Sequence, residues 1–448
     1  MITEPSQSNG TKIPATLLQR GATRFWFSIV CTGIGAGVSA IMLTRLLETV
    51  QHLAWAGSGT HILDAAEHAM AWRHVIVLLG AGFAVGIGQL VLVRLTSGNG
   101  IDITSAIWFS AGRLPSIRTL GSAFLSVVAV GMGASLGREG APKQAGAVAA
   151  NFMSDRQHLS DEQRRLLVAC GAGAGMAAAY GVPLGGALFA LEVLRGMLAL
   201  RLVLPALLAS LIAAAVSWLV LPNVPTYQVS AVTNPALALA LAALIGPLAG
   251  IVAVGYVRAV AFADCNKPSG WKRVVSPIFA LGLLGLASIK FPQLLGNGRD
   301  LSQLLFDGRI NSLHLIMLLL MLKPAATLLC VVSGTPGGLF TPSLTVGALL
   351  GGLLGYVCSQ FSSAVPQGLC AVLGAGALLA ATTQGPISTI VLMMELAGFD
   401  RTILAPLLLS VITATLVSRT IEPRSIYDAR LTDKEVDERL ALRESRNQ

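Results

Sequence analysis

The chain contains two copies of one segment, and this repeat constrains its fold more than any other feature. The segment Gly171–Pro183 (GAGAGMAAAYGVP) returns as Gly374–Pro386 (GAGALLAATTQGP). Each copy runs into an apolar stretch that stops at a glutamate, Glu192 in the first copy and Glu395 in the second, at one constant spacing (374 − 171 = 203 and 395 − 192 = 203). The chain is therefore expected to fold as two related halves.

A second repeated pair lies upstream of the first in each half. Gly137–Pro142 (GREGAP) corresponds to Gly337–Pro342 (GGLFTP), at a spacing of 342 − 142 = 200. Both segments place glycines before a proline, an order typical of a chain about to start a helix. Many transporters consist of two halves with interrupted helices, and their substrate site lies between the halves near the bilayer midplane. The repeat thus predicts a transport protein and the place of its site.

The composition is that of a membrane protein. Hydrophobic residues make up 54% and charged residues 12% of the chain, and the mean hydropathy is +0.71, whereas soluble domains carry roughly twice that charge. Several apolar runs are shorter than a full span or are cut by glycine and proline, which favours broken helices over simple rods. A soluble helical core is a poor alternative, because it could not bury so many runs. The runs are Phe25–Leu47, Val75–Val93, Ala123–Leu136, Leu202–Leu221, Ala236–Val257, Pro277–Ile289, Leu315–Val332 and Ile403–Val417.

The charged segments predict the domain organisation and the orientation in the membrane. The net charge is +9, but the basic residues lie in connecting segments, so nucleic acid is not an expected partner. Short basic segments mark the cytoplasmic side of an inner membrane. We expect a cytoplasmic N-terminal segment (1–24), a first transmembrane half (25–222), a second half (223–420) and a short cytoplasmic tail (421–448). The first apolar run is too long for a cleaved signal, so it is expected to be retained.

Sequence motifs of enzymes and metal proteins are missing from the chain. The six cysteines form no C-x-x-C pair, and the histidines show no H-E-x-x-H spacing, so neither a zinc site nor a disulfide framework is expected. A nucleophile with a neighbouring base is not recognisable either. We expect no catalytic residues, no metal ligands and no cofactor beyond a transported ion.

The segment Gly137–Gly140 can bind or gate an anion. Arg138 and Glu139 lie between apolar runs at membrane depth, where ionisable groups are costly and usually functional. A helix that starts here directs free N–H groups and its positive dipole end towards an anion. Leu339 and Phe340 follow glycines in the second copy, so two opposed helix N-termini could share one ion. The alternative is a purely structural Arg138–Glu139 pair.

Three further segments have ordinary structural interpretations. The stretch Ser97–Asp102 reads as a turn with an Asn-Gly dipeptide and an aspartate N-cap. Phe340 reads as a core aromatic residue. Tyr427 reads as an aromatic anchor at the membrane interface.

Taken together, these residues resemble the CLC family of chloride channels and chloride/proton antiporters. The resemblance covers roughly residues 25 to 430 and depends on GREG at 137–140, the segment 338–342, the repeats that end at Glu192 and Glu395, and Tyr427. It implies an all-α membrane fold of two inverted repeats with broken helices at a central anion site. It also implies a homodimer with one pore in each subunit, in the short form without regulatory nucleotide-binding domains.

The resemblance also implies roles for individual residues. Glu139 matches the gating glutamate, and Tyr427 matches the inner-gate tyrosine whose hydroxyl holds the central anion. Val193 stands where many antiporters carry an inner glutamate that passes protons to the cytoplasm. Residues expected at the anion are Gly98, Asn99, Gly100, Ile101, Arg138, Gly140, Leu339, Phe340 and Tyr427.

The chain departs from the family pattern in ways that affect the predicted function. Asn99 replaces the usual serine and Asp102 the usual proline, which leaves nitrate or fluoride as alternatives to chloride. Because valine cannot carry a proton, Val193 favours a channel-like, glutamate-gated chloride pore, opened by pH or voltage, over a coupled chloride/proton antiporter. The expected partners are small anions, chiefly chloride, with protons, the lipid bilayer and a second copy of the chain.

Overall fold

The computed structural model describes residues 22–55, 62–96, 102–229, 234–362, 365–428, 431, 434–436 and 438. Within these ranges the chain is helical between its loops, and its single β-type contact is an isolated antiparallel bridge between Gly137 and Gly338. This architecture confirms the all-α fold that the resemblance implies. The predicted boundary at residues 222 and 223 falls in the loop between two helices and stays a prediction.

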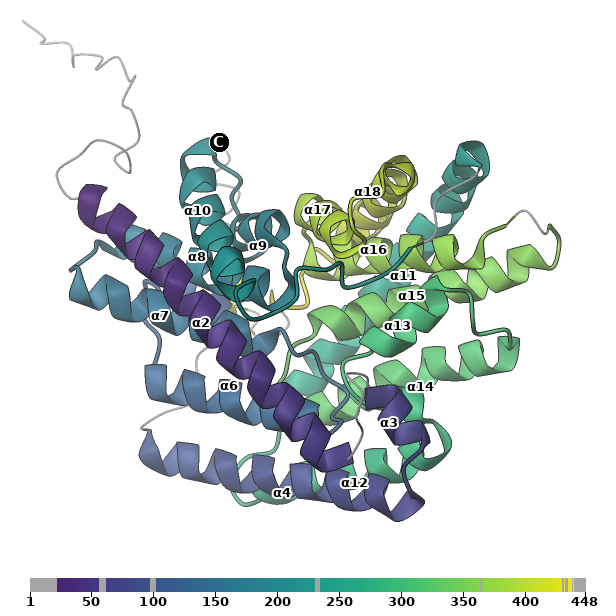
Figure 1. Ribbon diagram of the computed structural model, residues 1–448, viewed down its shortest axis with the longest axis horizontal. Coiled ribbons are helices and arrows are strands. Elements are labelled where there is room, and N and C mark those ends of the chain that lie inside the picture. The colour runs from purple at the N-terminus through teal and green to yellow at the C-terminus, as the bar shows by residue number, and fades with distance from the viewer. Residues whose placement is uncertain are drawn as a thin grey trace, which may run out of the picture.

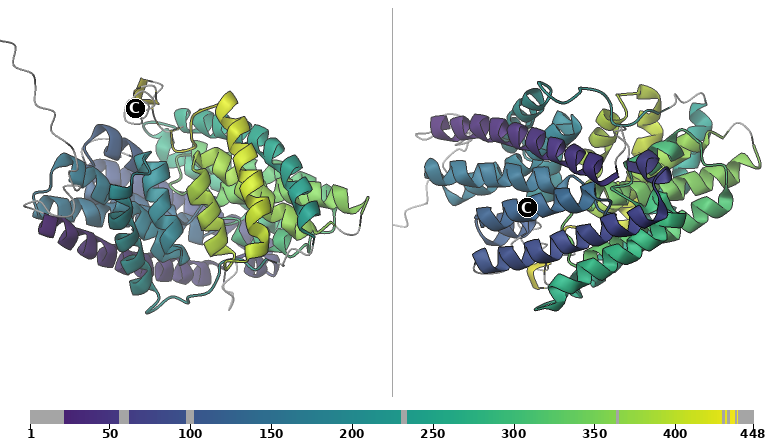
Figure 2. Two further views of the ribbon diagram at one scale, coloured as in Figure 1. Left: turned by 90° about the horizontal axis from the view of Figure 1, so that it is seen from above. Right: turned by 60° about the horizontal axis from the view of Figure 1, so that its bottom comes forward.

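Two groups of helices lie next to each other, with the N-terminal group in purple to teal and the C-terminal group in teal to yellow (Figures 1 and 2). The N-terminal group consists of α2 (Ala22–Trp55), α3 (Ile62–Glu67), α4 (Ala71–Leu95), α5 (Ile103–Phe109), α6 (Ser116–Gly131), α7 (Gly140–Arg156), α8 (Asp161–Tyr180), α9 (Pro183–Phe189), η1 (Ala190–Arg195) and α10 (Leu200–Ser217). The C-terminal group consists of α11 (Pro235–Cys265), α12 (Lys272–Lys290), η2 (Pro292–Leu294), α13 (Arg299–Phe306), α14 (Leu313–Val332), α15 (Phe340–Ser359), α16 (Gln367–Thr383), α17 (Pro386–Leu396), η3 (Arg401–Ile403) and α18 (Leu404–Ile421).

Seven helical segments in the described part of the chain are long and apolar enough to cross a membrane. They are Ala22–Trp55, Ala71–Leu95, Pro235–Cys265, Lys272–Lys290, Leu313–Val332, Phe340–Ser359 and Arg401–Ile421. In α15 the apolar window is 78% buried, against 33–50% in the other six. Helix α15 is therefore surrounded by protein, while the others present an apolar face outwards, as expected of a multi-pass membrane protein.

The repeated glycines allow equivalent helix pairs to pack closely in the two halves. A Cβ on Gly146 of α7 would overlap the carbonyl oxygen of Gly171 in α8. In the second half, a Cβ on Gly347 of α15 would overlap the carbonyl oxygen of Gly374 in α16. Small residues at such contacts let helix backbones approach in a membrane, where packing rather than the hydrophobic effect drives association. The two halves thus share one packing motif.

The repeated glutamates connect the halves reciprocally. Glu192 in η1 accepts hydrogen bonds from the backbone N–H groups of Ile387 (3.2 Å) and Ser388 (2.6 Å), at the start of α17. Glu395 in α17 accepts from the N–H groups of Leu184 (3.0 Å) and Gly185 (2.6 Å), at the start of α9. Each carboxylate thus satisfies free donors and the positive dipole end of a helix in the other half.

We expect the Glu395→Ala variant to be less stable than wild type by about 3 kcal/mol, because two backbone donors would lose a charged acceptor. Glu192→Ala should lower the free energy of unfolding by less, since the Glu192 side chain is only half-buried whereas Glu395 is buried. Thermal unfolding of the purified protein in detergent measures both effects, with the exposed Glu67→Ala as control. Equal melting temperatures for Glu395→Ala and Glu67→Ala would contradict the role of this contact.

Candidate anion site between the two halves

The two repeated segments Gly137–Pro142 and Gly337–Pro342 meet directly. The Gly137 N–H donates to the Gly338 carbonyl oxygen (2.7 Å), and the Gly338 N–H donates to the Gly137 carbonyl oxygen (2.8 Å). Helix α7 starts at Gly140 and α15 starts at Phe340, immediately after this bridge. The bridge therefore holds two helix N-termini close together in the protein interior, and both favour negative charge.

Glu139 directly precedes α7, but its side chain lies at the N-terminus of the opposite helix, α15. Its side chain is completely buried, and its Oε1 accepts a hydrogen bond from the backbone N–H of Phe340 at 2.7 Å. Its Oε2 accepts from the Thr341 hydroxyl at 3.1 Å and from the Tyr180 hydroxyl at 3.3 Å. An ionised carboxylate is stabilised by such donors. Glu139 thus fills the place where α15 could bind a free anion.

A small cavity lies between Gly140 at the start of α7 and Tyr427. The volume of the cavity is about 40 Å³, enough for a small ion. Three of the residues expected at the anion line this cavity, namely Gly140, Leu339 and Tyr427. Its lining is Asp102, Ile103, Thr104, Gly140, Lys143, Gln144, Leu194, Gly337, Gly338, Leu339 and Tyr427. We call it the inner cavity.

Lys143 is a charged residue of the inner cavity that the sequence reasoning missed. It lies in α7, one turn after Glu139, and is 6% exposed. Its Nζ donates to the Tyr427 hydroxyl at 3.4 Å and lies 4.8 Å from the centre of the Tyr427 ring and 5.2 Å from that of Phe189. The signal was visible, because Lys143 directly follows GREGAP in a stretch with few charges.

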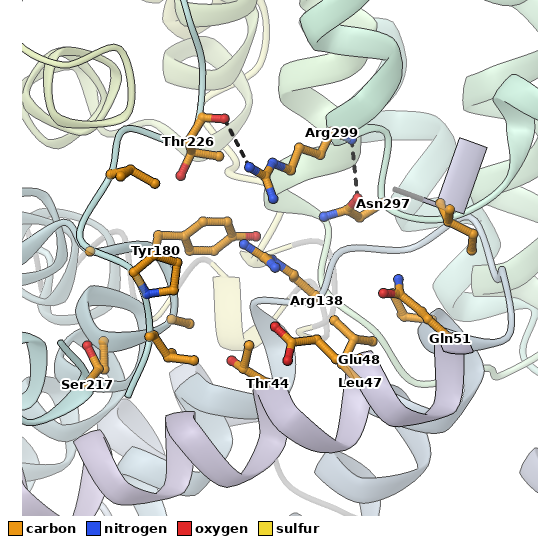
Figure 3. A pocket seen from close by; sticks show the side chains of 18 of the residues that line it. Thr44, Leu47, Glu48, Gln51, Arg138, Tyr180, Ser217, Thr226, Asn297 and Arg299 are labelled. Atoms are coloured by element: carbon orange, nitrogen blue, oxygen red, sulfur yellow. Dashed lines mark hydrogen bonds between the residues drawn. The ribbon is translucent and has the colours of Figure 1, made fainter. Parts of the chain in front are cut away.

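Arg138 faces a second, outer cavity of about 230 Å³ (Figure 3). Its guanidinium lies 4.9 Å from the centre of the Tyr180 ring. Arg299 also lines this cavity and donates from Nη2 to the Thr226 carbonyl oxygen at 3.3 Å. Glu48 of α2 lies across from them, and Asp300 completes the charged lining. The structure therefore places Arg138 at the outer cavity, while Tyr427 and Lys143 lie at the inner one.

The remaining predicted positions are residues 98–101 and Val193. Gly98, Asn99, Gly100 and Ile101 lie outside the described residues. Asp102 is the N-cap of α5, as predicted for an aspartate at this position. Its Oδ1 accepts a hydrogen bond from the Thr104 N–H at 2.9 Å. Val193 is buried in η1.

The arrangement supports ion binding without covalent chemistry. The site brings together two helix N-termini, the Glu139 carboxylate, the Tyr427 hydroxyl and the Lys143 ammonium. Backbone dipoles bind an anion less tightly than a full opposite charge would, which permits release and passage. In the described part of the chain, no group of three or more His, Cys, Asp or Glu side chains could hold a metal ion.

Comparison with known proteins identifies similar sequences. Residues 81–419 match the family model described as voltage gated chloride channel. The chain is 31% identical over 379 residues to the voltage-gated ClC-type chloride channel ClcB of Escherichia coli O9:H4 (strain HS), covering 82% of this chain and 88% of that protein. It is 27% identical over 437 residues to the H(+)/Cl(-) exchange transporter ClcA of Vibrio campbellii, covering 92% and 90%.

Solved structures share the fold at lower sequence identity. A slow cyanobacterial Cl−/H+ antiporter superposes with a TM-score of 0.78 at 20% identity, covering 92% of this chain and 97% of that one. A CLC-type fluoride/proton antiporter superposes with a TM-score of 0.70 at 22% identity, covering 91% and 98%. These likenesses confirm the predicted fold class.

Proposed function

The chain belongs to the voltage-gated chloride channel family, and from this premise we propose that it transports chloride across a membrane through the site between α7 and α15. The single observation that carries the proposal is the buried Glu139 carboxylate at the N-terminus of α15, hydrogen-bonded to the Phe340 N–H at 2.7 Å. A carboxylate at a helix N-terminus mimics a bound anion. When the Glu139 carboxylate leaves, a free anion can therefore bind in its place.

The gate follows from the chemistry of this carboxylate. Ionised, Glu139 competes with the anion for the donors of Phe340 and Thr341. Protonated, it is neutral, loses the attraction of the helix dipole and can leave. We therefore propose a pore that opens as the pH falls, with Tyr427 as the inner gate.

The setting of the pore is also part of the proposal. The span-length helices, the basic connecting segments and the bacterial relatives support a location in a bacterial inner membrane. By analogy with the family we propose a homodimer with one pore in each subunit.

The closest alternative is a coupled chloride/proton antiporter, and one observation argues against it. Val193 has no titratable atom, and the carboxylate of the adjacent Glu192 is bound to the N–H groups of Ile387 and Ser388. Glu192 is thereby held at α17 and is a poor proton carrier for the inner half of the path. Transport of nitrate or fluoride in place of chloride is the second alternative, because Asn99 departs from the family pattern.

We expect proteoliposomes with the purified protein to release chloride faster than protein-free vesicles, with a reversal potential set by the chloride gradient alone. A chloride electrode and a potential-sensitive dye measure both quantities, with and without an imposed pH gradient. Replacing internal chloride by nitrate or fluoride tests the second alternative. A reversal potential that shifts strongly with the pH gradient at fixed chloride gradient would show tight coupling, and the antiporter alternative would stand.

A further inference from the structure

Lys143 places a full positive charge inside the predicted anion path. The residue lies on α7, is 6% exposed and lines the inner cavity with Tyr427. A charged side chain in the interior of a membrane protein is costly and is usually functional. Lysine can extend its charge to a membrane surface when its helix lies at the periphery, but the burial of Lys143 excludes that explanation.

Aromatic groups hold the ammonium at the cavity. The Tyr427 hydroxyl accepts from Nζ at 3.4 Å, and the Tyr427 and Phe189 ring centres lie 4.8 and 5.2 Å from it. The two rings are packed edge to face, with their centres 5.7 Å apart. Contacts of a cation with ring faces and a hydroxyl orient it and lower the cost of burial.

The other charged residue of the inner cavity is acidic, and its charge opposes the binding of an anion. Asp102 also lines this cavity, and its Oδ1 accepts from the Thr104 N–H. A carboxylate at a cavity of about 40 Å³ repels an incoming anion. Lys143 lines the same small volume and offsets that repulsion.

We propose that Lys143 is a specificity-determining residue of the inner cavity, where its ammonium directly binds the transported anion. The proposal rests on the proposed function, since it concerns the same path. The site would take a small monovalent anion by charge attraction in addition to helix dipoles. Such a site is occupied at lower chloride concentration and releases its ion more slowly than one built from dipoles alone. A fixed cation there also repels protons that enter from Glu139.

Calorimetric titration of the purified, full-length protein with chloride tests the proposal. Lys143→Met should weaken chloride binding by about tenfold or more, because one charge at contact distance is lost. Lys143→Arg keeps the charge and should stay within about threefold of wild type. Lys290→Met, at an exposed lysine that ends α12, makes the same change in net charge and is the control. At saturating chloride, flux per protein should rise in Lys143→Met.

Two further variants separate direct binding from support of Tyr427. Lys143→Gln keeps a donor for the Tyr427 hydroxyl but should still lose affinity. Tyr427→Phe removes the hydroxyl but keeps the ammonium, and it should lower chloride affinity less than Lys143→Met does. If Lys143→Met fails to fold, Lys143→Gln decides, since lost chloride affinity supports the proposal and wild-type affinity overturns it.

The result that overturns this inference is distinct from the one that overturns the proposed function. If wild type transports chloride and folded Lys143→Met binds it as tightly as wild type does, only the role of Lys143 is wrong. If wild-type vesicles release no chloride, the proposed function is wrong, whatever the titration gives.

Discussion

Glu139→Gln is expected to give chloride flux that is high and nearly independent of pH. The substitution removes the charge that competes with chloride at the Phe340 N–H, while the size of the side chain is kept. Near neutral pH we expect an increase of about tenfold or more, because a full charge leaves a buried site. Wild-type flux should rise towards that of the variant as the pH falls and Glu139 becomes protonated.

Chloride efflux from proteoliposomes over a series of pH values measures this effect. Glu67→Gln, at an exposed position in α3, is the control for loss of a carboxylate and should follow the wild-type profile. A wild-type pH profile in Glu139→Gln would mean that the gate is elsewhere.

Gly338→Ala is expected to open the pore although Glu139 is kept. A Cβ on Gly338 would overlap Oε1 and Cδ of Glu139 and lie 3.0 Å from its Cγ. The backbone at Gly338 does not adopt a positive φ, so alanine causes no strain there. Since the clash is with a flexible side chain, the carboxylate should leave its position and the backbone bridge should remain. Flux should then increase by about tenfold or more at neutral pH and lose most of its pH dependence.

The same efflux measurement tests this variant, with Gly255→Ala as the matched control. A Cβ on Gly255 of α11 meets nothing within 4 Å, so that variant should behave like wild type. The double variant Gly338→Ala with Glu139→Gln should be no faster than Glu139→Gln alone, because both changes act on one contact. Low, pH-dependent flux in Gly338→Ala would contradict the placement of Glu139.

Features that follow from local chemistry could be predicted from the sequence. Charged residues between glycines at membrane depth indicated a site at Glu139, and the repeat indicated that Gly337–Pro342 would lie opposite it. The structure joins the two segments by the bridge from Gly137 to Gly338. Position 338 must be a glycine for Glu139 to lie where it does, because the Glu139 side chain fills the space that a Cβ at position 338 would take.

Features that depend on how distant helices meet could not be predicted. Tyr180 and Thr341 donate to Glu139 only because α8 ends beside the start of α15, and neither residue is unusual in its own segment. Lys143 could be seen as a charge in an apolar stretch, but its burial depends on the interior position of α7. The partners of Glu192 and Glu395 lie in the opposite half, so the sequence showed the repeat without showing what the carboxylates bind.

The central claim is that the Glu139 carboxylate occupies an anion-binding position. Anomalous diffraction from crystals grown in bromide tests it most directly, because bromide substitutes for chloride and is located by its own signal. We expect bromide in the inner cavity beside Lys143 and Tyr427 in both wild type and Glu139→Gln. Only Glu139→Gln should show a further bromide at the Phe340 N–H. A Glu139→Gln crystal without that bromide, or wild-type bromide already at that place, would contradict the claim.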